Sequence, residues 1–219
     1  MLLLCAGDLH LGRRSSRLPE TVDPAPLACA HAWGALVEHA IARRVDLVAL
    51  SGDLVDRKNR YFEALGPLEA GIRRLARAGI RTVAVAGNHD HDVLPLVARS
   101  LPRDAFTLLG AGGTWERCTI ERDGARLHVD GWSFPAEHVR ESPLAAYPAR
   151  DDDGAPVLGL LHCELDAAAG RYAPVARAAL HATPVALWLL GHVHAPAEYA
   201  PPGAGGARLL YPGSLQAMD

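Results

Sequence analysis

The chain has 219 residues, a formal net charge of −3 at pH 7 and 49% hydrophobic residues. This length is typical of one domain, and we expect residues 1–219 to form a single domain. The composition excludes a disordered chain, a coiled coil and a strongly basic nucleic-acid-binding arm. No apolar run approaches the ~18 residues of a membrane span, and the first residues lack the basic leader of a signal peptide. We therefore expect a cytoplasmic protein with no membrane partner.

The first part of the chain alternates predicted strands with predicted helices. An apolar strand over Leu2–Cys5 comes first, and the apolar runs Asp46–Asp53 and Arg81–Asp90 each follow a segment of helical periodicity. These helical segments lie around Leu27–Arg43 and Phe62–Ala78. The β-α-β-α-β order predicts parallel strands joined by right-handed crossovers, with a ligand crevice at the carboxyl ends of the strands.

The second part of the chain predicts a further sheet. Gly-rich turns separate short alternating strands between Gly110 and Phe134, a pattern that favours antiparallel pairing. Two buried runs then end at His162 and His194, and a last strand is expected within Ala207–Ser214. The intervening loops are too short to serve as interdomain linkers.

Polar side chains that can bind or support a metal ion follow five of these apolar runs. Any one of them has an ordinary explanation, because an Asp after a strand often caps a helix and a single His is often a hydrogen-bonded structural residue. Five such clusters at one edge of a core would be a costly coincidence. The residues are Asp8 and His10, then Asp53, then Asn88 and His89, then His162, and last His192 and His194.

The blocks GDLH, GDLVDR, GNHD, LLHCE and GHVH occur in this order between Gly7 and His194. In these blocks the chain resembles the calcineurin-like metallophosphoesterase superfamily. The resemblance implies an α/β fold, a four-layer α-β-β-α sandwich of two mixed sheets with a two-metal centre. It further implies that one ion is held by Asp8, His10 and His194, that the other is held by Asn88, His162 and His192, and that Asp53 bridges both.

A pair of divalent ions explains this choice of ligands. Two ions about 3.5–4 Å apart share a hydroxide, lower its pKa and clamp the phosphate oxygens during in-line attack. The mixed set of oxygen and nitrogen donors suits manganese, iron or zinc. We take Mn²⁺ as the first choice, with Fe or Zn as alternatives. The resemblance thus predicts a metal-dependent phosphoesterase whose nucleophile is the metal-bridging hydroxide.

His89 needs a separate role, because its neighbour Asn88 already supplies a ligand and adjacent side chains point in different directions. In the family the matching His stands over the phosphate and protonates the leaving oxygen or stabilises its charge. The GDLVDR block also resembles that of Ser/Thr protein phosphatases, which implies that Asp56 orients His89 and that Arg57 binds substrate phosphate. A solvated Arg57 is the alternative. Asp90 either supports the site or caps a helix that begins near residue 91.

The resemblance to one branch of the superfamily bears on the substrate. The DLHLGR start, the GNHD block and the YPGSLQ segment resemble the nuclease subunit of SbcD-type DNA repair exonucleases, which implies hydrolysis of DNA phosphodiesters and an SMC-like ATPase partner. Those proteins continue into a capping region that we expect this chain to lack. The net charge of −3 and the single lysine, Lys58, argue against DNA.

Other functions stay open beside DNA hydrolysis. The first alternative is a small-nucleotide phosphodiesterase, and the second is a phosphomonoesterase of the protein-phosphatase type, which GNHD in place of GNHE disfavours. A catalytically inactive scaffold would show degraded ligand positions, whereas these are intact. Arg13 and Arg14 either meet an anionic substrate or belong to a solvated loop. The oligomeric state is open.

Overall fold

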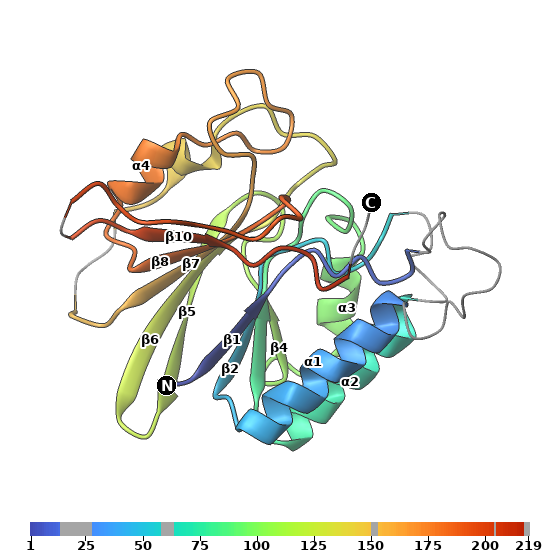
Figure 1. The fold of residues 1–219 in the computed structure, drawn as a ribbon. Helices are drawn as coiled ribbons and strands as arrows, with labels where there is room; N and C mark the ends of the chain where they lie inside the picture. The colour runs from blue at the N-terminus through green and yellow to red at the C-terminus, as the bar shows by residue number, and fades with distance from the viewer. Residues whose placement is uncertain (14–27, 58–63, 150–152, 204, 217–219) are drawn as a thin grey trace.

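The computed structural model describes residues 1–13, 28–57, 64–149, 153–203 and 205–216. Two sheets pack face to face with helices on their outer sides (Figure 1). The first sheet has four parallel strands in the order β1-β2-β3-β4, which are Leu3–Ala6, Leu47–Leu50, Arg81–Ala84 and Phe106–Leu108. The crossovers contain three helices, α1 at Cys29–Arg43, α2 at Leu65–Arg77 and α3 at Leu94–Ser100.

The second sheet has the order β5-β6-β7-β8-β10-β9. Its pairs β5/β6 and β9/β10 are antiparallel, and the other three pairs are parallel. Mixed pairing was expected of both sheets but occurs only here, because a helix follows each of the first three strands of the other sheet and returns the chain in the same direction. The strands are Trp115–Arg122, Ala125–Trp132, Val157–His162, Leu187–Gly191, Ala197–Tyr199 and Arg208–Tyr211, in chain order from β5 to β10.

Three apolar clusters hold the layers together. In β2, Val48 and Leu50 belong to the cluster under α1 and α2, whereas Leu47 and Ala49 belong to the cluster between the sheets. This separation follows from the two-residue period of a strand, which sends alternate side chains to opposite faces. A third cluster lies on the outer face of the second sheet and includes Leu180 of the short helix α4, Arg177–His181. The predicted four-layer α-β-β-α architecture is therefore confirmed.

The two long helices pack closely at one crossing. Trp33 lies on the same face of α1 as Val37 and Ala40, and all three side chains are buried. The Trp33 indole lies over Gly71 of α2, where an added Cβ atom would come within 2.2 Å of the indole Nε1. That nitrogen donates a hydrogen bond to the carbonyl oxygen of Pro67 at 3.0 Å. Because Gly71 has no side chain, the indole packs directly against α2 and fills the interface between the two helices.

Some element boundaries differ from the sequence prediction. The helix expected near residue 91 begins only at Leu94, because residues 88–93 form turns beside the strand ends. The expected helix starts at Leu27 and Phe62 lie outside the described residues, within which these helices begin at Cys29 and Leu65. No helix in the described part of the chain is long and apolar enough to cross a membrane.

Candidate metal centre

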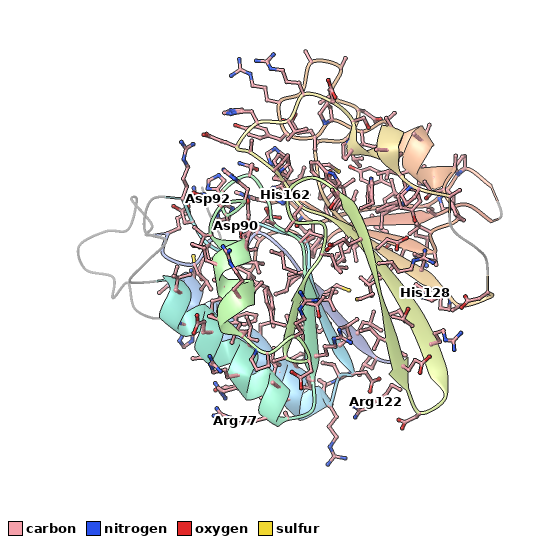
Figure 2. The ribbon with its side chains drawn as sticks, turned by 180° about the vertical axis from the view of Figure 1, so that it is seen from behind. Arg77, Asp90, Asp92, Arg122, His128 and His162 are labelled. Atoms are coloured by element: carbon pink, nitrogen blue, oxygen red, sulfur yellow. The ribbon has the colours of Figure 1, made fainter. Side chains whose placement is uncertain are left out.

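The predicted metal-binding residues lie at one edge of the two sheets. They follow β1, β2 and β3 of the first sheet and end or follow β7 and β8 of the second. Figure 2 shows Asp90, which follows β3, and His162, which ends β7, at the same end of the molecule, with Arg77 and Arg122 at the opposite end. The carboxyl ends of strands from both sheets thus meet, as the sequence predicts.

Oxygen and nitrogen donors at this edge form three compact groups. Within each group, donor atoms lie within 4.8 Å of one another. The Asp53 Oδ2 atom lies 3.8 Å from His10 Nε2 and 3.4 Å from His162 Nε2, so it stands between imidazoles of the two sheets. The groups are Asp8 with His10 and His194, Asp8 with Asp53 and His162, and His10 with Asp53 and His89.

Asn88 and His192 complete the predicted set in different ways. The Asn88 Oδ1 atom lies 3.1 Å from His162 Nε2 and so faces the second group directly. The His192 ring is 5.3 Å from the His162 ring, but His192 belongs to none of the three groups. Its Nε2 atom instead faces the Glu164 carboxylate at 3.5 Å, while its backbone N–H donates to Asp8 Oδ1 at 3.1 Å.

The backbone at these positions is strained. A positive φ is unfavourable for residues other than glycine and costs about 1–3 kcal/mol where the surrounding structure enforces it. Two interstrand hydrogen bonds hold the strained segment, from Asp8 N to Gly52 O at 3.0 Å and from His10 N to Asp53 O at 2.9 Å. Four predicted ligands have such angles, namely Asp8 at 50°, His10 at 45°, Asp53 at 50° and His192 at 96°.

Two glycines allow the donors to approach one another. A Cβ atom on Gly87 would lie 2.1 Å from Asp53 Oδ1. A Cβ atom on Gly191 would lie 2.1 Å from the Ser51 carbonyl oxygen and 2.5 Å from His162 Nδ1. The same carbonyl oxygen faces His162 Nδ1 at 3.0 Å, which leaves Nε2 turned to the site.

Asp90 supports the site from behind and does not cap the following helix. Its carboxylate accepts hydrogen bonds from Leu54 N at 2.6 Å and Gly87 N at 2.8 Å, and α3 has no side-chain cap. Burial and, to a smaller extent, the neighbouring Asp53 carboxylate raise the pKa of Asp90 to about 7. This side chain therefore joins the loop after β2 to the loop after β3.

The charges of the site call for a cation. Burial raises the pKa of Asp8. Burial also acts to raise the pKa of Asp53, but His162 and His10 hold it below its ordinary value. Burial acts to lower the pKa of His162, yet Asp53 raises it to about 9. Among the described residues only histidines pair with these two buried carboxylates. The donor set thus fits divalent ions, which would replace the proton on His162 as the balancing charge.

Asp56 lies between two histidines. Its Oδ2 atom is 3.6 Å from His10 Nδ1 and 3.8 Å from His89 Nδ1. Burial lowers the pKa of His89, whose side chain is 32% exposed and so remains open to solvent at the mouth of the site. Asp56 thus lies beside both His89 and the predicted ligand His10, and its role in orienting His89 stays a prediction.

Arg57 forms an ion pair with a residue that sequence analysis did not identify as part of the site. Its guanidinium forms an ion pair with Glu137, which lies beyond the second sheet's β6. Arg13 donates its backbone N–H to the carbonyl oxygen of His10 at 2.9 Å, and Arg14 lies outside the described residues. The substrate-binding roles of these arginines stay predictions.

Sequence analysis also missed two residues that contact His192. Glu164 lies two positions after His162 in the LLHCE block, so its position offered a signal. Tyr172 packs against the His192 ring with centroids 4.7 Å apart, and His138 stacks on Tyr172 at 5.4 Å. These last two come from loops whose composition gives no indication of the contact.

The fold and the candidate metal centre are those expected of the calcineurin-like phosphoesterase family. A family model described as calcineurin-like phosphoesterase matches residues 1–196, and the chain belongs to this family. It is 28% identical over 219 residues to the uncharacterized metallophosphoesterase YhaO of Bacillus subtilis strain 168. That match covers 97% of this chain but 52% of the relative, so the chain spans about half the length of the relative.

Two solved structures have the same fold. A dimetal phosphatase from Danio rerio has a TM-score of 0.59 at 13% identity, covering 97% of this chain and 87% of that chain. The calcineurin-like phosphoesterase YfkN from Bacillus subtilis has a TM-score of 0.58 at 14% identity, covering 97% of this chain and 81% of that chain. These two likenesses show the fold, and the family match over residues 1–196 shows the family to which the chain belongs.

Proposed function

We propose that the protein is a two-metal phosphodiesterase that hydrolyses nucleic acid, with DNA as the first candidate. The observation that carries the two-metal assignment is the position of Asp53 Oδ2 between His10 Nε2 and His162 Nε2, at 3.8 and 3.4 Å. Manganese is the first choice of metal, with iron or zinc as alternatives. The proposed ligands are Asp8, His10, Asp53, Asn88, His162, His192 and His194.

His89, Asp56 and Glu164 would supply the catalytic and positioning functions that the metal ligands do not. Two divalent ions at this position would polarise the phosphate and lower the pKa of an attacking water molecule. His89 Nδ1 faces Asp56, which leaves Nε2 as the donor of a proton to the leaving oxygen. In this proposal Asp56 orients the ring through its charge, at 3.8 Å from Nδ1. Glu164 faces His192 Nε2 and so favours a tautomer with a free lone pair on Nδ1.

The Arg57–Glu137 ion pair favours a phosphodiester over a phosphomonoester. A monoester carries an additional negative charge, which a free guanidinium near the ions would neutralise. Here the Arg57 guanidinium is already paired with the Glu137 carboxylate. DNA and an SMC-like ATPase partner are proposed from the resemblance to SbcD-type nucleases. A phosphomonoesterase is the second candidate, because Arg57 itself matches the phosphate-gripping position of protein phosphatases.

The test compares esters with Mn²⁺ present. We expect faster hydrolysis of bis-p-nitrophenyl phosphate than of p-nitrophenyl phosphate. His89→Ala should retain metal and reduce hydrolysis of a dinucleotide, which has a poor leaving group, by about 10²–10⁴-fold, with a smaller loss on the activated aryl diester. His39→Ala, which removes an exposed imidazole on α1, is the matched control.

Two outcomes would contradict the proposal. Faster hydrolysis of the monoester, together with no DNA cleavage that depends on His89, would move the assignment to a phosphatase. Equal losses on the dinucleotide and the aryl diester would remove the general-acid role from His89.

A further inference from the structure

A groove outside the metal centre runs between the open edges of the two sheets. It has a volume of about 820 Å³, in the range of ligand sites, and it follows β4 on one side and β5 on the other. These are the edge strands of their sheets. None of the predicted metal ligands lines it. We call it the β4–β5 groove, and its polar lining includes Arg81, Arg99, Arg103, Thr107, Glu116 and Arg117.

Arginines dominate the charge of the β4–β5 groove. Arg117 forms a bidentate pair with Asp130, with contacts of 2.7 and 2.8 Å. In the described part of the chain, the other three arginines form no ion pair with a carboxylate. Arg99 donates only to the Pro95 carbonyl oxygen at 3.2 Å, and Arg103 has no side-chain partner there. The one acid in the lining, Glu116, accepts a hydrogen bond from the backbone of residue 110. The groove is thus positive on a chain whose net charge is −3.

Arg81 adds a fixed positive charge to the groove. Its Nη2 atom donates to Thr107 Oγ1 at 3.0 Å, which fixes the guanidinium at the β3–β4 junction. Its Nε atom is buried and has no hydrogen-bond partner among the described residues. A guanidinium that is fixed in this way and lacks a carboxylate pair is suited to a phosphate group.

The groove ends level with the metal centre. Trp115, at the start of β5, pairs with Trp132 of β6, which pairs with Leu161, the neighbour of His162. Two strand spacings separate β5 from β7, so this end of the groove lies about 10 Å from the predicted ligands. At the roughly 3.4 Å rise of a stacked strand, that distance corresponds to about three nucleotides.

We propose that the β4–β5 groove binds the phosphate backbone of a single nucleic acid strand whose scissile phosphate lies at the metal centre. The proposal rests on the proposed phosphodiesterase function. Arginine suits this ligand because it bonds bidentately to phosphate and is always charged. The three arginines without a carboxylate pair are separated in the sequence, at positions 81, 99 and 103, so they form no basic run. Arg117, which is paired with Asp130, lines the same groove from β5.

The experiment measures binding of a fluorescein-labelled oligodeoxythymidylate by fluorescence anisotropy across a salt series, with Mn²⁺ present and in a His89→Ala background in which cleavage is slow. The test variant carries Arg99→Ala and Arg103→Ala, both at exposed positions. The control carries Arg43→Ala and Arg77→Ala, which remove the same charge from α1 and α2 outside the groove. Each lost phosphate contact should reduce the log–log salt slope by about 0.7, hence by about 1.4 for the test variant. The control should keep the wild-type slope.

Competition experiments identify the class of ligand. Unlabelled oligodeoxythymidylate should displace the probe, whereas polyglutamate, ATP and inorganic phosphate at the same charge concentration should not. Displacement by polyglutamate would assign the groove to an acidic peptide, and tight ATP binding without strand binding would assign it to a free nucleotide. Either result overturns the proposal, as does an equal loss in both variants.

A failure of the proposed phosphodiesterase function would be detected by a different measurement from a failure of the groove proposal. Hydrolysis of bis-p-nitrophenyl phosphate with Mn²⁺ tests the metal centre, and both double variants should match the wild type because this small ester does not span the groove. Absence of that hydrolysis in the wild type would contradict the phosphodiesterase, whereas an unchanged salt slope in the test variant would contradict the groove.

Discussion

Asp53 is the residue on which the two proposed ion sites depend. Replacing it with Asn removes a charge while keeping the shape, and the loss of one unit charge from a ligand shared by both cations should weaken binding by roughly 100-fold or more. We expect isothermal titration with Mn²⁺ and elemental analysis to show that Asp53→Asn no longer holds two ions tightly. The control is Asp123→Asn, because Asp123 is 94% exposed and its φ of 49° matches the 50° of Asp53. Retention of two tight ions in Asp53→Asn would rule out its bridging position.

At the same scale, the sequence could predict residues that lie at strand ends but not those that reach the site across loops. His162 and Asp53 end or follow buried apolar runs, and the carboxyl ends of strands have a known common edge. Glu137 meets Arg57 only because residues 80 positions apart are brought together by the packing of the two sheets. The same holds for Tyr172 beside His192. No local pattern encodes such contacts.

Among the helices and strands, the length of an element determined whether it could be predicted from the sequence. The helices α1 and α2 have 15 and 13 residues, enough for a periodic apolar face to be read from the sequence. The helix α3, with seven residues, and the strands β4 and β9, with three each, are too short to show a period. The strand β9 is defined by its pairing with β10, a tertiary contact. The start of α3 is displaced by the turns around Asp90, whose carboxylate binds the backbone beside the strand ends.

The crossing of α1 and α2 predicts opposite effects for two Gly→Ala changes. At Gly71 a Cβ atom would lie 2.2 Å from the Trp33 indole, so Gly71→Ala should lower the free energy of unfolding by about 1–3 kcal/mol. At Gly34, on α1, nothing lies within 4 Å, so Gly34→Ala should raise it by about 0.5–1 kcal/mol through helix propensity. Urea titrations followed by circular dichroism measure both values. Destabilisation by both changes to the same extent would mean that the indole does not limit the contact.

At the scale of the whole molecule, the metal centre connects the two sheets at one edge. The cluster between the sheets is apolar, with Val83 and Val85 from the first sheet facing Leu158 and Leu160 from the second. The ligands extend this junction with polar groups, since Asp53 follows a strand of the first sheet and His162 ends a strand of the second. The buried charges that favour ion binding also oppose close approach of the sheets while no cation is bound. Metal binding should therefore stabilise the whole fold as well as prepare it for catalysis.

This reasoning predicts that Mn²⁺ raises the midpoint of thermal unfolding and that EDTA reverses the change. A ligand at 100 times its dissociation constant stabilises the native state by about 2.7 kcal/mol for one site, which for a protein of this size corresponds to roughly 5–10 °C. Differential scanning calorimetry with increasing Mn²⁺ measures the shift. Asp53→Asn should show a much smaller shift, whereas Asp123→Asn should respond like the wild type, because its carboxylate lies on the exposed β5–β6 turn. An unchanged midpoint in the wild type, or an equal shift in Asp53→Asn, would show that ions do not join the two sheets through this carboxylate.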